Sequence, residues 1–397
     1  MSTRPSWPPS ARAALAVAVF LVSWGLLHHG FYARSRIVDT PIYERYGEAM
    51  TDGEVPYRDF AVEYPPAALP VFVLPAVGSG DSNDYSRRFE GLMAALGVAS
   101  VLLVAAVASS VWPAVFVAVA PLLLGSVELS RFDAWPAALT VAALALLVRG
   151  SFAFGLGTLG VATAAKLYPI VLVPLALTHV WRVGGRGAAA RSAAFFAAVV
   201  GGIVLPFAAV SPGGVWDAFW RQAGRPLQIE SLGSSFLLAA HHLFGVDVTM
   251  ESSHGSQNLA GPLPDAVAVS STLVQAALLV AIWVWYARGG SDRDRLLTAS
   301  AAAVCAFVAL GKVLSPQFLI WLVPLVPLVR GRRGIAASAL LGVALVLTQL
   351  WFPYRYWRLA LEFDPAASWL VLVRDLVMVA LTLVLATAVR RERSRSG

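Results

Sequence analysis

The sequence contains few charged residues, very little lysine and a single cysteine. Charged residues make up 13% of its 397 positions, against roughly 25% in a typical soluble domain. A chain of two or three soluble domains is therefore excluded. Cys305 lies in an apolar run and has no second cysteine with which to form an intrachain disulfide. The cysteine content thus carries no information on the redox compartment.

Several motifs of nucleotide-driven and metal-dependent proteins are also missing. No P-loop, nucleophile elbow or dinucleotide-binding fingerprint occurs in a fitting context, which argues against an ATP-driven pump. No HExxH or CxxC spacing occurs, and the adjacent His241 and His242 would lie on different faces of a helix. We expect no cofactor, while a divalent metal with other ligands stays open.

Hydrophobic residues dominate the chain, at 58%, and recur in runs of membrane-spanning length. Such runs predict an all-α polytopic membrane protein with a single transmembrane domain over residues 1–397. The net charge of +7 comes from arginine clusters between the runs. Arginines in such places orient helices, so they do not indicate nucleic-acid binding. The first run ends at Leu27 without a small-residue cleavage site, and we expect a retained helix rather than a signal peptide.

The arginine-rich connections predict a topology. The tail RRERSRSG, the RGRRG segment at 330–334 and the links at 182–191 should be cytoplasmic. The 30–66 stretch and the long 211–263 loop then fall outside, and both termini fall inside a cell membrane. About twelve crossings result: the first run and segments at 67–77, 89–109, 134–148, 151–165, 167–181, 191–210, 264–287, 296–311, 313–329, 334–351 and 368–389.

The segment between residues 66 and 128 fits this topology least well. It holds three apolar runs where an even number of crossings is needed. The basic SRR at 86–88 indicates a cytoplasmic turn. We therefore expect crossings at 67–77 and 89–109 and a non-spanning helical piece at 111–127, with the helix count open by one or two.

An acidic, aromatic stretch at 37–66 separates the first two apolar runs, and it holds seven of the 23 acids and four tyrosines. Helical spacing predicts an amphipathic surface helix over 40–51, stopped by Asp52-Gly53. One face of this helix comprises Tyr43, Tyr46, Gly47 and Met50. The acids expected only to face solvent are Glu44, Glu48, Asp52 and Glu54.

Asp39 is the carboxylate with two competing interpretations. It follows the first apolar run by about a dozen residues, close to the outer surface. In a partly buried pocket it would serve as a general base towards a hydroxyl group. It also occupies the N-cap position of the helix predicted at 40–51. The residues alone leave these two roles open.

Lys166 and Lys312, the only two lysines, fall at external ends of predicted spans, against the positive-inside bias. Either lysine alone fits a snorkelling residue, with its amine at the headgroups. Together with Arg131, Arg355 and Arg358 on the same side, they favour an anionic ligand, for which a lipid phosphate is well suited.

Six motifs recur in an order that resembles one enzyme family. VDTPIY at 38–43 and a Gly53–Pro66 run ending in EYPP come first. RFDAWPA at 131–137, KLYPIVLVPL at 166–175, QIES at 228–231 and KVLSPQFLIWLVPL at 312–325 follow. From about residue 30 to residue 330, this set resembles the GT-C superfamily of membrane glycosyltransferases. More narrowly, it is similar to glycosyltransferase family 87, the polyprenol-phosphate-mannose-dependent branch.

The resemblance implies a GT-C-like fold of eleven to thirteen transmembrane helices, with a catalytic aspartate in the first external loop. Asp39 occupies that position. The reaction implied is inverting transfer of a sugar, mannose above others, from a polyprenyl-phosphate donor to a lipid or glycan acceptor. The Thr-Pro that follows Asp39 departs from the expected pattern and leaves the sugar in doubt.

Residues in these motifs, and two arginines beyond them, are candidates for binding the substrates. Lys166, Lys312 and Arg131, with Arg355 and Arg358 as weaker candidates, are expected to bind the donor phosphate. A phosphate leaving group departs as a stable anion, so positive charge matters more than a general acid. Residues expected to bind sugar or acceptor are Arg58, Asp59, Glu63, Tyr64, Asp133, Gln228, Glu230 and Gln317.

Two other classes of function remain possible from the sequence. A transporter or flippase of polyprenyl-linked lipids would also contain proline-broken helices, but the polar residues gather on one side and no repeat is visible. A scaffold in a cell-envelope assembly is the other class. The arginine-rich, lysine-poor composition suggests a bacterial, GC-rich genome.

Overall fold

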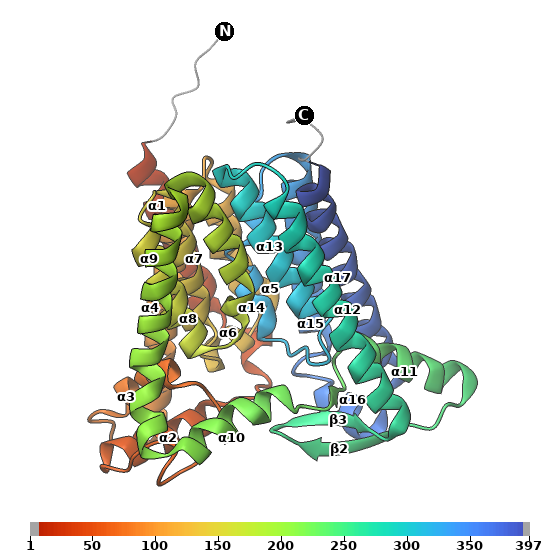
Figure 1. Ribbon diagram of the computed structural model, residues 1–397. Coiled ribbons are helices and arrows are strands. Elements are labelled where there is room, and N and C mark those ends of the chain that lie inside the picture. Colours follow the sequence, from red (N-terminus) through yellow and green to blue (C-terminus); the bar gives the residue numbers. More distant parts are fainter. Residues whose placement is uncertain (1–7, 392–397) are drawn as a thin grey trace.

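The computed structural model describes residues 8–391 and shows a bundle of helices (Figure 1). The first helix, α1 (Pro9–Leu26), begins and the last, α17 (Pro365–Arg391), ends at the same end of the bundle, here called the terminal end. The opposite end, here called the site end, carries short helices and all the labelled strands. The other helices are α2 (Thr40–Thr51), α3 (Leu69–Ala76), α4 (Ser82–Val107), α5 (Trp112–Leu124), α6 (Val127–Ser130), α7 (Ala134–Val148), α8 (Phe152–Ala165), α9 (Val173–Val210), α10 (Pro212–Ala223), α11 (Leu232–Phe244), α12 (Pro262–Ala287), α13 (Arg293–Ala309), α14 (Phe318–Leu322), α15 (Gly331–Trp351) and α16 (Tyr356–Glu362), with 3-10 turns η1 (Gly30–Ala33), η2 (Pro66–Ala68), η3 (Tyr168–Leu172) and η4 (Val326–Leu328).

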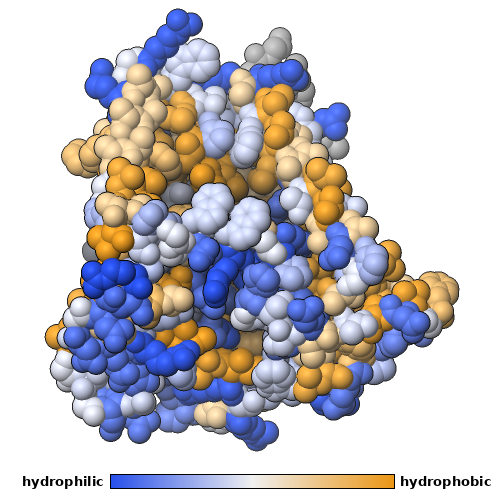
Figure 2. All heavy atoms as spheres, turned by 60° about the horizontal axis from the view of Figure 1, so that its bottom comes forward, coloured by the Kyte–Doolittle hydropathy of each residue, from blue (hydrophilic) through white to orange (hydrophobic). Residues whose placement is uncertain are grey.

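Five helical segments in the described chain are long and apolar enough to cross a membrane: α4, α12, α15, α17 and the segment Tyr168–Val210. Shorter apolar helices pack among them, including α1, α5, α7 and α8. Gly185, at φ 80°, divides α9 into two arms, within the segment predicted to link two spans. Figure 2 brings the site end forward and shows hydrophobic residues over the sides of the bundle, with hydrophilic ones gathered at this end. The fold is that of an all-α membrane protein, and the number of crossings remains a prediction.

α3 and α5 differ from the predicted topology. α3 has eight residues and rises only about 12 Å, and it packs against α2 at the site end. α5 packs against α1, α4 and α15 within the bundle. The segment 67–77 therefore lies at one end of the bundle and the segment 111–127 lies inside it, whereas the sequence predicted that 67–77 crosses the membrane and 111–127 does not.

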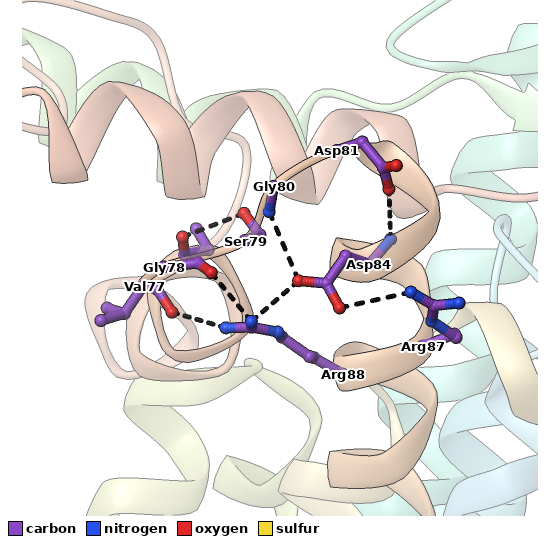
Figure 3. Close-up of polar contacts among 9 residues, drawn as sticks. Val77, Gly78, Ser79, Gly80, Asp81, Asp84, Arg87 and Arg88 are labelled. Atoms are coloured by element: carbon purple, nitrogen blue, oxygen red, sulfur yellow. Dashed lines mark hydrogen bonds and ion pairs between the residues drawn. The ribbon is translucent and has the colours of Figure 1, made fainter.

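The basic SRR at 86–88, predicted to be cytoplasmic like the RGRRG segment at 330–334, lies at the opposite end of the bundle from that segment. It lies in the first turns of α4, which pack against α2 and α3 at the site end. Arg88 pairs with Asp84 at 2.8 Å and donates hydrogen bonds to the carbonyl oxygens of Val77 and Gly78, at 2.7 and 2.8 Å (Figure 3). The Arg88 guanidinium group thus pairs with the carbonyl oxygens that follow α3 and with a carboxylate of α4. These local contacts account for a basic residue here without reference to the side of the membrane.

α2 covers Thr40–Thr51, as the spacing predicted, and packs its aromatic face against α3. The Tyr43 ring stacks on Phe72, with 4.6 Å between ring centroids. Gly47 permits this contact, since a Cβ there would lie 2.5 Å from the carbonyl oxygen of Phe72. Glu44 was expected to face solvent but is only 8% exposed, because α4 covers the flank of α2 that carries it.

The 211–263 loop contains structure that the all-α expectation missed. After α10, the strands β1 (Leu227–Gln228), β2 (Thr249–Ser253) and β3 (Ser256–Ala260) form an antiparallel sheet in the order β1-β3-β2. His254 and Gly255 connect β2 to β3 with φ values of 54° and 67°. Positive φ at both positions is typical of a tight hairpin turn.

Candidate active site

A polar cavity of about 240 Å³ lies at the site end. In Figure 2, hydrophilic residues gather in a hollow in the middle of this face. The cavity joins segments far apart in the chain, from the start of α2 to α16. Its lining comprises Ile37, Asp39, Ile42, Glu63, Tyr64, Arg131, Lys166, Gln222, Arg225, Gln228, Glu230, His254, Gly255, Ser256, Gln257, Ser315, Pro316, Gln317, Phe318, Phe352, Tyr356 and Trp357.

Asp39 immediately precedes α2, but its side chain makes no capping hydrogen bond to that helix. Its carboxylate forms an ion pair with Arg131 and accepts a hydrogen bond of 3.4 Å from the Tyr43 hydroxyl. The Asp39 side chain is 23% exposed, whereas that of Arg131 is 6% exposed. Of the two interpretations left open by the sequence, the geometry favours a carboxylate presented to the cavity.

Arg131 is fixed by the backbone as well as by Asp39. It donates a hydrogen bond to the carbonyl oxygen of Ile37 at 3.3 Å. Burial lowers the pKa of the Arg131 guanidinium to about 10, against the opposing effect of the nearby acids Asp133 and Glu230. The group is therefore still cationic at neutral pH and holds the opening stretch against the α6–α7 connection.

Lys166 follows α8 and is held over a buried carboxylate. Its Nζ lies 2.6 Å from Oδ1 of Asp133, which also accepts a 2.6 Å hydrogen bond from the indole of Trp321. The ammonium group lies 4.6 Å from the Phe132 ring centroid and 5.3 Å from that of Trp321. Asp133 is fully buried beneath this lysine and does not line the cavity, so it positions Lys166 and is not placed to bind sugar.

Gln228 and Glu230 form another part of the wall of the polar cavity. Gln228 donates hydrogen bonds to Glu230 Oε2 at 2.5 Å and to Ser315 Oγ at 2.8 Å. The backbone carbonyl of Glu230 accepts a 2.7 Å hydrogen bond from Arg374 of α17. Burial raises the pKa of the Glu230 carboxyl to about 8, which the charges of Arg374 and Arg131 only partly offset. Its Oε1 atom has no hydrogen-bond partner among residues 8–391, so it is available to a ligand.

An apolar cavity of about 310 Å³ adjoins the polar one. Side chains of η3, α12 and α13 contribute to it, among them Ile170, Thr272 and Phe307. Lys312 also lies here, and its ammonium group donates a 2.9 Å hydrogen bond to the Ala223 carbonyl oxygen. The residues that line both cavities are Tyr64, Lys166, Gln222, Arg225 and Phe318.

Of the predicted residues, the polar cavity brings together Asp39, Arg131, Lys166, Glu63, Tyr64, Gln228, Glu230 and Gln317. Two predicted pairs lie outside both cavities. Arg58 bonds its neighbour Asp59 at 2.8 Å, and this hydrogen bond, with another from the Val55 amide, lowers the pKa of the Asp59 carboxyl to about 2. That pair closes the turn after α2.

Arg355 and Arg358 are the second pair. Arg358 forms ion pairs with Glu362 and Asp364, and its side chain is 57% exposed. The guanidinium group is thus engaged at the end of α16. The residues of this region that do line the cavity are their neighbours Tyr356 and Trp357.

Sequence reasoning missed Arg225, Gln222 and the hairpin turn at His254. Arg225 is the first residue of RPLQIES and lines both cavities. Its proximity to the QIES motif was the available signal. Gln222 donates a 2.9 Å hydrogen bond to the Glu63 carbonyl oxygen. The His254 turn carried no signal, because only the folded hairpin brings it to the cavity.

No group of three His, Cys, Asp or Glu side chains in the part of the chain that the structure describes is arranged to hold a metal ion. Metal dependence, which the sequence leaves open, is a question for experiment.

A bundle of apolar helices with a polar cavity at one end defines an integral membrane protein with a one-sided site. The family model described as Glycosyltransferase family 87 matches residues 62–316, well over half of the chain, and the chain belongs to that family. It is therefore a membrane glycosyltransferase. No curated protein matches the sequence. The family match begins after Asp39, so the place of this residue in the site depends on geometry.

Proposed function

We propose that this glycosyltransferase transfers a sugar, with mannose as the first candidate, from a polyprenyl-phosphate donor to a hydroxyl group of a lipid or glycan acceptor. The observation that carries the proposal is the contact between a polar cavity containing Asp39 and an apolar cavity of similar size. A lipid-linked sugar has the same two parts. A phosphate lies between them, and basic residues stand on the shared wall.

The donor would lie across this wall. Its prenyl chain would enter the apolar cavity past Ile170 and Phe307, and its sugar would enter the polar cavity. The phosphate would then meet Lys166 and Arg225, which line both cavities, with Lys312 near the lipid side. Preorganised cations at the point where charge develops are usually the largest contribution to such catalysis.

Asp39 would act as general base. Its carboxylate accepts the proton of the acceptor hydroxyl while the acceptor oxygen bonds to the anomeric carbon. The bond from that carbon to the phosphate oxygen breaks on the opposite face, so configuration inverts and polyprenyl monophosphate leaves. The ion pair with Arg131 and the bond from Tyr43 fix the carboxylate in position. Glu230 Oε1 and Gln317 would hydrogen-bond the sugar or the acceptor.

The active site would face the outside of the cell. Arginines at the terminal end of the bundle include Arg182, Arg288 and Arg330. Under the positive-inside rule this end is cytoplasmic. The cavities at the other end would then receive substrates from the outer leaflet.

Incubation of purified protein with a panel of polyprenyl-phospho-sugars and lipid acceptors tests the proposal. Release of polyprenyl monophosphate together with glycosylated acceptor is expected for at least one donor, with polyprenyl-phospho-mannose first. Transport of a labelled donor across proteoliposomes without any transfer product would instead support a flippase and reject the proposed reaction.

A further inference from the structure

A third cavity, of about 660 Å³, lies at the terminal end of the bundle, away from the active site. It is bounded by the last residues of α4, the first residues of α5, α13 and α15, and η4. No side chain that lines it takes part in the proposed transfer reaction. Its size falls within the range of small-ligand sites, roughly 300–1,000 Å³.

Two arginines and three serines supply its polar lining: Arg293, Arg330, Ser109, Ser110 and Ser338. Arg330 pairs with Asp294 at 2.6 Å, but its side chain remains 47% exposed. Arg293 Nε has no hydrogen-bond partner among residues 8–391. Among the described residues, the lining holds two guanidinium groups and no carboxylate, which suits an anion with several acceptor oxygens.

The backbone around the cavity also favours an anionic ligand. Helices α5, α13 and α15 all begin at this cavity, with Trp112, Arg293 and Gly331 in its wall. The first turns of α5 and α15 have no side-chain cap. The positive ends of these helix dipoles therefore add to the two arginines.

The remaining wall is apolar and open towards the surface of the bundle. Trp112 is 50% exposed and Ile335 is 65% exposed, and both line the cavity. A free phosphate ion would use the arginines but leave these side chains without a partner. An anionic amphiphile would use both.

We propose that this cavity binds the phosphate headgroup of an anionic membrane phospholipid in the leaflet at the terminal end. The headgroup phosphate lies between Arg293 and Arg330, and the acyl chains run past Trp112 and Ile335 along the bundle. Basic pockets between transmembrane helices on the cytoplasmic side recognise anionic lipid headgroups in this way. The site does not depend on the transfer reaction at the other end.

Native mass spectrometry of the purified full-length protein, titrated with phosphatidylglycerol, phosphatidylcholine or inorganic phosphate, tests the proposal. Phosphatidylglycerol should bind in preference to phosphatidylcholine. The double variant Arg293→Gln/Arg330→Gln should bind it roughly 25-fold more weakly, since each arginine that contacts the headgroup phosphate contributes about fivefold. Arg332→Gln removes an exposed charge from the same turn of α15, outside the cavity lining, and should change binding less than twofold.

A second pair of variants leaves both arginines in place. Ser110 is exposed at the cavity, so Ser110→Glu adds a repelling carboxylate and Ser110→Gln is its neutral match. Only the glutamate should weaken phosphatidylglycerol binding. Equal binding by the double variant, by Ser110→Glu and by their controls would overturn the proposal. Displacement of the lipid by inorganic phosphate at millimolar concentration would assign the cavity to free phosphate and reject the lipid.

Discussion

The two adjoining cavities at the site end differ in how they hold their charges. In the polar cavity, Asp39 and Arg131 neutralise each other and are fixed by further hydrogen bonds. In the apolar cavity, the Lys312 ammonium group donates a hydrogen bond to a backbone carbonyl and lies among side chains such as Ile170 and Phe307. Under the proposed function, this difference corresponds to a division of labour: the polar cavity would preorganise the reacting groups, and the apolar cavity would accept a prenyl chain.

Replacement of Asp39 should have the largest effect if this division is correct. Asp39→Asn keeps the size of the side chain but removes the proton acceptor, and general-base catalysis is typically worth about 10²–10⁴ in rate. Transfer by the purified variant should fall by that factor, whereas donor binding, measured separately, should change little.

Asp59→Asn is the matched control, because Asp59 lies outside both cavities and pairs with Arg58. It should retain transfer within a few-fold of wild type. Wild-type turnover in Asp39→Asn would remove Asp39 from the mechanism and leave the polar cavity without its base.

The contrast between Asp39 and Asp59 shows how far the sequence could be interpreted. Both belong to motifs that resemble the family, and their spacing gives no reason to separate them. The bounds of α2 could be predicted from local periodicity, because the spacing of apolar residues in a short amphipathic helix shows which face each residue lies on. What the local pattern could not show is that Asp59 is satisfied by its own neighbours, while Asp39 meets Arg131 from a segment 92 residues away.

Removal of Lys166 from the shared wall should have the next largest effect. Lys166→Met takes a cation from the expected phosphate position, and loss of one such preorganised group typically costs about 10²-fold in rate. It also leaves the buried Asp133 without its ion-pair partner, which destabilises a protein by roughly 3–5 kcal/mol. Transfer rate and thermal stability should therefore fall together.

The double variant Lys166→Met/Asp133→Asn separates these two effects. Removing the unpaired carboxylate should restore most of the melting temperature while transfer stays about 10²-fold slow. Recovery of transfer along with stability would mean that Lys166 only neutralises Asp133 and does not assist the donor phosphate.

The path of the 211–263 loop explains why the sequence did not predict all of the residues that line the two cavities. Its path depends on contacts with distant backbone: Ser211 donates to the carbonyl oxygen of Tyr57 at 2.9 Å, and Gln222 to that of Glu63. Neither contact leaves a periodic signal in the sequence. Arg225 reaches the cavities because these distant bonds fix α10, and the His254 turn reaches the polar cavity because β3 pairs with β1.

A bulky residue in the apolar cavity should have a smaller and more selective effect. Thr272 lines that cavity from α12, and Thr272→Trp would occupy volume needed by a prenyl chain. The KM for a long-chain donor should rise about tenfold, with kcat and the KM for a short-chain donor nearly unchanged, because only uniform binding is lost. Ser270→Trp, exposed on the same helix outside the cavity lining, is the control. Equal effects on both chain lengths would contradict the proposed division of labour.

Glu230 offers the finest test of the polar cavity, because its carboxyl differs in environment from that of Asp39. Burial raises its pKa from 4.5 to about 8, so the folded protein binds this proton more tightly than the unfolded chain does. The stability contributed by that proton is fully present below about pH 4.5 and is lost as the pH rises towards 8.

Glu230→Gln imitates the protonated group and should be free of this loss. The melting temperature of the wild type should therefore fall relative to that of Glu230→Gln as the pH rises from 5 to 8, while the two proteins transfer sugar at similar rates at pH 6. A difference in melting temperature that does not change with pH would show that Glu230 is ionised in the folded protein.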